Sequence, residues 1–313
     1  MTLAAQSAPS RSRPASRPFG EHLRHWRQHR RLSQLDLAGA AEISTRHLSF
    51  VETGRSVPSR EMVLRLAERL QVPLRERNAL LVAAGYAPMY RERSLDDPAL
   101  AAARAAVDLI LKSHEPFPAL AVDRHWNLLA ANAMVPLLLA GADASLLQKP
   151  VNVLRLSLHP LGLAGRIVNI VQWREHVFER LRQQVQATAD ESLAGLLEEL
   201  RGYPLPPGAE ATTLAGEHPG VAMPFQFRSD HGLLNFISTT TVFGTPVDVT
   251  LQELALETFS GGCADRRRAA QAPPLSIAVG LHAQLPGRAA DAVVRPPARG
   301  FPSHVPMTRR PHA

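Results

Sequence analysis

Cysteine is nearly absent from this sequence of 313 residues, in which Cys263 stands alone. A single cysteine cannot form an internal disulfide, which excludes the disulfide-stapled class of small secreted domains and fits a reducing compartment. Long apolar runs are missing too, because the most apolar stretch, 128–147, is interrupted by Asn132, Pro136 and Asp143. We therefore expect a soluble, cytoplasmic protein with no membrane partner.

The short motifs of common catalytic and cofactor sites are also missing. The sequence has no glycine-rich phosphate loop ending in lysine, no Gly-x-Ser-x-Gly elbow, no His-Glu-x-x-His pair and no second cysteine. His22, His25 and His29 recur at a helical spacing, but no cysteine or cluster of acids accompanies them as further metal ligands. We expect neither an enzyme nor a bound cofactor or metal.

The net charge of +7 is distributed unevenly along the chain. Residues 19–90 contain eleven arginines against seven acidic residues, whereas residues 91–265 contain thirteen basic against twenty acidic ones. Both ends are basic, with three arginines in residues 1–18 and eight in residues 266–313. A basic N-terminal segment favours DNA as a partner, and the acidic middle is unsuited to be a second nucleic-acid surface.

Two short amphipathic helical patterns follow one another within residues 33–54. Each begins at a serine, Ser33 or Ser44, a residue type that caps helix N-termini. The apolar positions after these serines are Leu37, Ala38 and Ala41 in the first pattern and Leu48 and Val51 in the second. Gly54 supplies the C-terminal stop. This is the layout of a helix-turn-helix, and the alternative is an ordinary helical hairpin with a solvated outer face.

The second pattern predicts which side chains face outward. If Leu48 and Val51 point to the core, Thr45, Arg46 and Ser49 share the opposite face of the helix. Their hydroxyl and guanidinium groups suit hydrogen bonding to base edges in a major groove.

Residues 19–86 resemble the helix-turn-helix of the Xre and phage-repressor family, whose docking on DNA is well described. The matching motifs are Ser33-Gln34, Leu37-Ala38, Ser44, Leu48-Ser49, Glu52-x-Gly54-Arg55 and Pro58-Ser59. One departure is Glu42 in the turn, where relatives often have glycine. The resemblance implies a small all-α domain of five helices that binds DNA.

The resemblance also implies roles for individual residues. Gln34 would contact a phosphate, and Thr45, Arg46 and Ser49 would read bases. The other residues of the predicted DNA-binding set are Ser44, Phe50, at a thymine methyl, and Arg55, near a backbone phosphate. Inside the domain, the family's paired arginine and glutamate would be Arg27 and Glu52.

Beyond residue 97 the pattern mixes helices and strands. We expect helices over 99–112, from Asn132, over 166–186 and over 191–200. Strands are expected over 221–227 and 233–243, and a strand or hairpin arm over 119–130. Residues 229–232 form a turn signal between the last two strands, and 249–259 reads as a closing strand or a short helix. The mixture predicts an α+β domain with an antiparallel sheet.

Residues 105–259 resemble the C-terminal domain of MmyB-like regulators, which has a PAS-like fold. The matching phrases are residues 122–127 (VDRHWN), Ala131-Asn132, residues 152–156 (NVLRL) and residues 243–246 (FGTP). Relatives are thought to hold small apolar molecules, including fatty acids. The resemblance therefore implies an apolar small molecule, such as a fatty acid, as a partner.

The side chains expected around such a ligand are aromatic or aliphatic. They are Trp126, Leu128, Trp173, Phe225, Phe227 and Phe236, together with Ile237. An ordinary packed core would be lined by the same residue types, so pocket and core are alternatives at this point.

The expected organisation is multi-domain. It consists of a disordered basic arm (1–18), an all-α five-helix lambda-repressor-like DNA-binding domain (19–90), an α+β PAS-like domain with an antiparallel sheet (98–262) and a disordered Pro/Arg-rich tail (263–313). The tail is either a natural extension or the product of a frame error, since the resemblance ends near Phe259.

These observations predict a sequence-specific transcription regulator that binds double-stranded operator DNA as a homodimer and responds to a ligand through an apolar pocket. The alternative is a protein-interaction or scaffold module whose helical domain binds DNA only non-specifically.

Overall fold

The computed structural model describes residues 17–209, 223–230, 232–244, 246 and 248–261. Nearly all of the predicted N-terminal arm and the whole predicted tail lie outside these residues. Within the described part of the chain, no helix is both long and apolar enough to cross a membrane.

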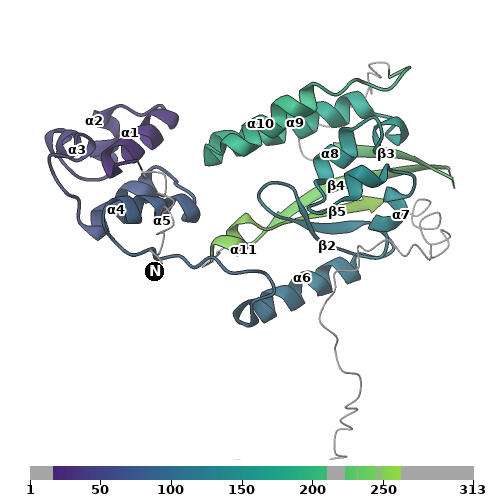
Figure 1. The fold of residues 1–313 in the computed structure, drawn as a ribbon, viewed down its shortest axis with the longest axis horizontal. Coiled ribbons are helices and arrows are strands. Elements are labelled where there is room, and N and C mark those ends of the chain that lie inside the picture. The colour runs from purple at the N-terminus through teal and green to yellow at the C-terminus, as the bar shows by residue number, and fades with distance from the viewer. Residues whose placement is uncertain (1–16, 210–222, 231, 245, 247, 262–313) are drawn as a thin grey trace, which may run out of the picture. The chain divides into compact units, whose positions relative to one another are not determined.

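The N-terminal part is helical (Figure 1). Its five helices are α1 (Phe19–His29), α2 (Gln34–Ala40), α3 (Thr45–Glu52), α4 (Arg60–Arg69) and α5 (Leu74–Ala83). The predicted caps Ser33 and Ser44, and Ser59 before α4, each accept a hydrogen bond from the backbone N–H three residues later. Helix α1 ends at His29, two residues before Arg31, where the backbone is left-handed at φ 57°.

The predicted turn chemistry of this part is present. Glu42 and Gly54, which follow α2 and α3, both have left-handed backbone, at φ 57° and 71°. Gly20 permits a close approach of α1 to α3, because an added Cβ would lie 2.3 Å from the Glu52 carbonyl oxygen. The apolar faces close one core, which includes Leu23, Trp26, Leu37, Leu48, Val51, Leu66, Leu80 and Leu81.

The second part is built on a five-stranded antiparallel sheet with the order β2-β1-β5-β4-β3. The strands are β1 (Ala119–Val122), β2 (Leu128–Ala131), β3 (Met223–Ser229), β4 (Gly232–Val242) and β5 (Ala255–Gly261). The hairpin predicted around residues 229–232 is present as β3–β4, and the segment predicted to be a strand or hairpin arm forms the hairpin β1–β2. The C-terminal strand β5 is central and pairs Glu257 with Leu120 on one side and with Thr240 on the other.

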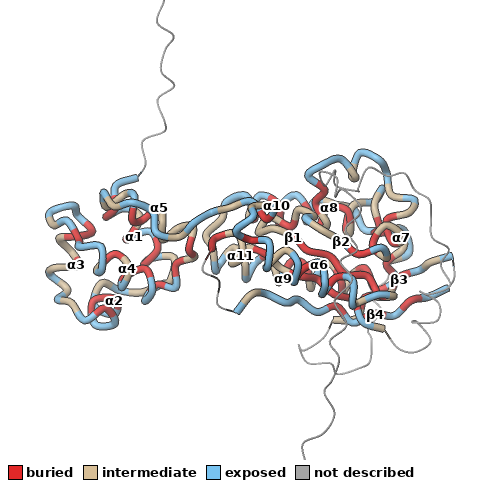
Figure 2. Tube along the Cα trace, turned by 90° about the horizontal axis from the view of Figure 1, so that it is seen from below, coloured by how far each residue is buried: buried red, intermediate tan, exposed pale blue. Residues whose placement is uncertain are grey.

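Helices cover both faces of the sheet (Figure 1). One face packs on α6 (Ala101–Ser113), and the other is covered by α8 (Val153–Leu158), α9 (Ile170–Thr188) and α10 (Glu191–Arg201). Two shorter helices are α7 (Val135–Leu139) and α11 (Val249–Glu253). Buried residues run along the strands and the inner sides of these helices (Figure 2). The α+β class predicted from the sequence is therefore correct.

Some predicted boundaries are wrong. The long helix α9 begins at Ile170, four residues after the predicted start, because Val168 donates its N–H to Gln226 of β3 instead of entering a helix. The helix expected from Asn132 begins at Val135, because the buried Asn132 side chain is bonded to the start of β1. It accepts the N–H of Ala119 and donates to the carbonyl of Phe117. Residues 249–259 contain both expected alternatives, α11 and then β5.

Candidate DNA-binding helix and ligand-binding cavity

Helix α3 presents a polar outer face. Leu48 and Val51 are buried, whereas Arg46 is exposed and Thr45 and Ser49 are partly exposed. Ser44, at the N-cap, accepts the N–H of His47 with its hydroxyl oxygen. The predicted base-reading groups thus share one side of the helix and are accessible to a partner.

Phe50 lies between two arginines of the predicted DNA-binding set. The Arg46 guanidinium is 5.4 Å from the centre of its ring and that of Arg55 is 6.0 Å away. Because an aromatic face attracts cations, the ring holds both arginines near the end of α3. Sequence reasoning assigned Phe50 a thymine contact and did not foresee this stacking.

Arg27 and Glu52 form a buried ion pair between α1 and α3. Arg27 donates to both Glu52 oxygens, at 2.6 and 2.9 Å, and to the Leu32 carbonyl at 2.9 Å. The hydrogen bonds to Glu52 raise the pKa of Arg27. Gln34 donates its amide to Glu52 at 2.8 Å. The amide predicted to bind a phosphate is therefore part of this internal network.

A cavity of about 80 Å³ lies between the sheet and the helices α7, α8 and α9. Four residues of the predicted set line it: Trp126, Leu128, Trp173 and Phe225. Other residues also line the cavity but were not predicted to surround a ligand, among them Leu138, Leu139, Leu154, Leu156 and Phe259.

Three residues predicted to line a pocket lie elsewhere. Phe227 is buried beneath the Arg166 guanidinium, 4.4 Å from the ring centre, and Phe236 packs on Phe117 with ring centres 6.2 Å apart. Ile237 is 48% exposed, because successive residues of a strand point to opposite faces and its neighbour Phe236 points inward.

The cavity has one charged corner. Arg180 of α9 donates to both oxygens of Glu257 on β5, at 2.7 and 3.1 Å, and the Thr240 hydroxyl donates to the same carboxylate at 2.8 Å. Sequence reasoning missed this pair. The signal for it is a glutamate within the buried run of β5, a position that demands a charged partner.

Trp126 reaches this corner from the β1–β2 turn. Its backbone is left-handed at φ 67°, a conformation that favours glycine and costs a bulky residue about 1–2 kcal/mol. The turn is held by Asp123, which accepts N–H groups of His125 and Asn127. The indole ring stacks 4.6 Å from the Arg180 guanidinium and donates to Gln184 at 2.9 Å.

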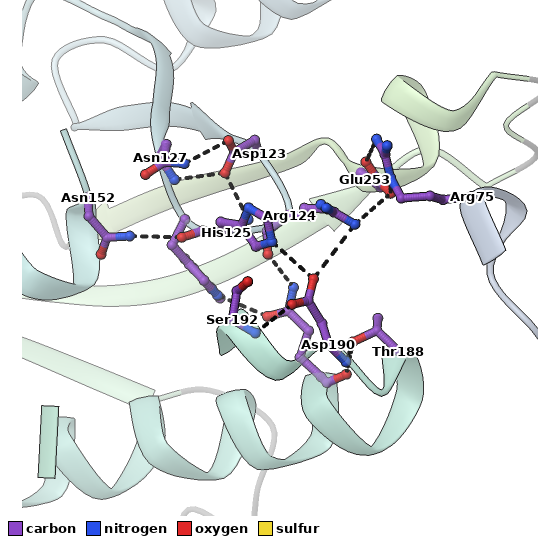
Figure 3. Close-up of polar contacts among 12 residues, drawn as sticks. Arg75, Asp123, Arg124, His125, Asn127, Asn152, Thr188, Asp190, Ser192 and Glu253 are labelled. Atoms are coloured by element: carbon purple, nitrogen blue, oxygen red, sulfur yellow. Dashed lines mark hydrogen bonds and ion pairs between the residues drawn. The ribbon is translucent and has the colours of Figure 1, made fainter. Parts of the chain in front are cut away.

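A polar network lies beside the same turn (Figure 3). Asp190, the N-cap of α10, pairs with His125 at 2.9 Å and with Arg124 at 3.6 Å. Although burial opposes it, the pairing with His125 and the N–H of Ser192 lower the pKa of Asp190. Arg124 also approaches Glu253, at 3.8 Å.

The helical part contacts this region through arginines of α1 and α5. Arg75 donates to both oxygens of Glu253, at 2.8 and 2.9 Å (Figure 3). Arg30 donates to the carbonyls of Gln186 and Ala187, at the C-terminal end of α9, at 2.6 and 2.7 Å. His29 is bonded to the Gln186 carbonyl as well, at 2.7 Å. Among the described residues, no group of three or more His, Cys, Asp or Glu is arranged to hold a metal ion.

Comparisons with known proteins agree with this architecture. Residues 18–80 match a family model described as a helix-turn-helix domain, and residues 103–272 match one described as an MmyB-like transcription regulator ligand binding domain. The second match continues beyond Phe259, where the resemblance found from the sequence ended. No curated protein matches the chain. Both families are of regulatory and ligand-binding type. The chain therefore belongs to the MmyB-like transcription regulators, with a DNA-binding helix-turn-helix domain followed by a ligand-binding domain.

Proposed function

We propose that this regulator binds a specific operator as a homodimer and that an apolar small molecule in the α7–α9 cavity controls its binding. The observation that supports specific binding is the outer face of α3, on which Thr45, Arg46 and Ser49 are accessible while Leu48 and Val51 are buried. Dimerisation is proposed because one such helix reads only a few base pairs, and a two-fold operator doubles the contact.

Arg46 is the residue proposed to determine base preference. Its guanidinium is exposed, and its place over the Phe50 ring limits the directions in which it can point. An arginine fork bonds two acceptors of guanine at once, a contact worth about 1–3 kcal/mol of discrimination.

The test uses DNA selected from a random pool by the wild-type protein, with mobility shifts over a salt series. Arg46→Ala should weaken binding to the selected sequence by about 1–3 kcal/mol and relax the preference at one base position. Arg182→Ala, which removes an exposed arginine of the second domain, is the control for net charge. Equal affinity and selectivity of Arg46→Ala and wild type would refute the assignment.

The salt series separates specific binding from the alternative, an interaction or scaffold module that binds DNA without sequence preference. Retention of one sequence at physiological salt supports the regulator. Binding that vanishes with salt for every sequence alike supports the alternative, because that dependence is typical of phosphate contacts.

An apolar ligand is supported by the lining of the cavity, in which leucines and aromatic rings predominate. The first experiment is native mass spectrometry of the purified full chain, with organic extraction to identify what is released. A mass increment that extraction removes supports a resident apolar molecule, such as the fatty acid that the sequence resemblance suggested. A plain core would give the bare chain mass and bind no added apolar compound.

The route from cavity to DNA is proposed to run through α9 and β5. Both line the cavity, at Arg180 and Glu257, and both lead to arginines of the helical domain: α9 ends at the carbonyls bound by Arg30, and Glu253 precedes β5 and binds Arg75. A ligand that shifts these elements would shift the DNA-binding domain. Ligand and operator must then change each other's affinity by the same factor, which parallel titrations can check.

A further inference from the structure

The ring of Phe50 lies between two arginines, one on the outer face of α3 and one in the loop that follows it. The ring centre is 5.4 Å from the guanidinium carbon of Arg46 and 6.0 Å from that of Arg55. Both arginines are exposed, and Phe50 is partly exposed. Among the described residues neither guanidinium forms an ion pair, so both keep their N–H groups for a partner.

The contact with the ring leaves the hydrogen-bonding edge of Arg46 accessible. The N–H groups of a guanidinium point outward in its plane, whereas an aromatic ring is stacked against its face. Arg46 can therefore donate to both major-groove acceptors of a guanine, O6 and N7, while the Phe50 ring stays beside it.

With Arg46 on a guanine, the ring lies beside the next base pair. Arg46 and Phe50 are four residues apart in α3, so their side chains are neighbours on one side of the helix. Successive base pairs are about 3.4 Å apart along the DNA axis. The ring centre, 5.4 Å from the guanidinium carbon, is therefore within reach of an adjacent pair. A phenyl ring offers no hydrogen-bonding group, and thymine is the base whose major-groove edge carries a methyl group.

We infer that Arg46 and Phe50 act as one unit that reads two adjacent base pairs, a guanine through the guanidinium and a thymine through the ring. Each half of the operator then contains a G·C pair directly next to a T·A pair. Arg55, on the other side of the ring, binds a backbone phosphate, a contact without base preference. The inference rests on the proposed function, since it requires α3 to enter the major groove, and it specifies two neighbouring positions of the operator.

The experiment removes a single methyl group from the DNA. The operator is first selected from a random pool by the full-length wild-type protein, and each half should contain a thymine next to a guanine. Each such thymine, on either strand, is then replaced by deoxyuridine, which pairs in the same way but lacks the methyl group. Mobility shifts should show about three- to fivefold weaker binding at one of these positions, the loss expected when one methyl group is no longer buried.

Deoxyuridine in the DNA that flanks the selected sequence is the control for the modified base itself. The flanking substitution should bind as tightly as the unmodified operator, because no side chain of α3 reaches it.

Substitutions of Phe50 test whether the ring is the group that detects the methyl. Phe50→Ala should bind the thymine and deoxyuridine operators equally, and its preference for the neighbouring guanine should fall because Arg46 is no longer held by the ring. Phe50→Leu keeps an apolar side chain without an aromatic face. It should retain part of the deoxyuridine penalty and lose guanine preference. Val82→Ala, which removes a 52% exposed apolar side chain from α5 of the same domain, is the matched control and should keep the full penalty.

The outcomes separate this inference from the proposed function. A selected operator without thymine next to guanine, or wild-type binding that ignores every such methyl, overturns the two-base reading and leaves sequence-specific binding standing. A full deoxyuridine penalty in a Phe50→Ala variant with a normal melting curve also overturns it. Failure of the pool to yield any preferred sequence overturns both proposals. If Phe50→Ala does not fold, the wild-type comparison and Phe50→Leu decide.

Discussion

In each domain of this regulator a buried glutamate pairs with an arginine, and the two pairs have almost the same geometry. Arg27 and Glu52 meet at 2.6 and 2.9 Å, and Arg180 and Glu257 at 2.7 and 3.1 Å. Their surroundings differ. The first pair is enclosed by protein groups, whereas the second borders a cavity. The same chemistry joins two helices in one domain and joins a helix to a strand beside a cavity in the other.

The enclosed pair should show the larger stability effect. Glu52→Ala strands the Arg27 guanidinium, which is 11% exposed, and removes the acceptor of the Gln34 amide. Removing one partner of a buried pair costs about 3–5 kcal/mol, because the remaining charge has no compensation. Thermal unfolding of the full chain measures the loss.

The control for this prediction is Glu68→Ala. Glu68 is an exposed glutamate of α4, and surface substitutions usually change stability by less than about 0.5 kcal/mol. A melting temperature of Glu52→Ala equal to that of wild type would show that the pair does not hold the helical domain together.

In the second pair, Arg180 stacks on the ring of Trp126, a residue with strained backbone. Substitutions of Trp126 therefore test how this pair differs from the enclosed one. Removing the ring loses its packing and its stacking on Arg180, so Trp126→Ala should cost about 3–5 kcal/mol. Trp126→Gly should be more stable than Trp126→Ala by about 1 kcal/mol, because glycine tolerates φ 67°. Chemical denaturation measures both differences.

The control for that comparison is the pair Leu128→Ala and Leu128→Gly in β2. At an ordinary strand position alanine is the more stable of the two residues by roughly 0.5–1 kcal/mol. If glycine is also the worse residue at position 126, the left-handed backbone exerts no strain in the protein.

The two pairs also show what a sequence can and cannot predict. The helical domain is specified locally: caps at Ser33 and Ser44, a stop at Gly54 and the face of α3 follow from spacings within one or two turns. The partner of Glu257 lies 77 residues away, on another kind of element. No local period links the two, so the sequence could not identify Arg180 as the partner of Glu257.

The predicted cavity lining matches the structure only in part, for a related reason. Strand alternation predicts that Phe225 and Phe227 share a face of the sheet. The cavity lies over one part of that face, and of these two residues it is lined by Phe225. Where a sheet is covered tightly and where a gap remains depends on how α7 to α9 pack. That packing is decided by the whole domain and by no single segment.

A substitution of Gln34 tests whether this residue, which is bonded to the Arg27–Glu52 pair, also contacts DNA. Gln34→Ala removes the amide that bonds Glu52 and is proposed to reach a phosphate with its other N–H. Binding to every sequence should weaken alike, by about 1 kcal/mol, because phosphate contacts have no base preference. Mobility shifts with selected and unrelated DNA measure it, and a loss confined to one sequence would contradict the phosphate role.

The smallest expected effect concerns Asp190, beside the Trp126 turn. The lowered pKa of Asp190 means that its carboxylate stabilises the fold above the unfolded-state value near pH 4, and that this contribution is lost as the pH falls through the lower folded value. Asp190→Asn should therefore be less stable than wild type at pH 6, by less than about 1 kcal/mol because solvent screens the group in part. The difference should shrink as the pH falls through the lowered folded pKa of Asp190, since protonation then leaves both proteins uncharged at this position. Urea unfolding at several pH values measures the gap, and a difference that stays constant as the pH falls through that pKa would show that Asp190 acts through its hydrogen bonds as the N-cap of α10 and not through its charge on His125 and Arg124.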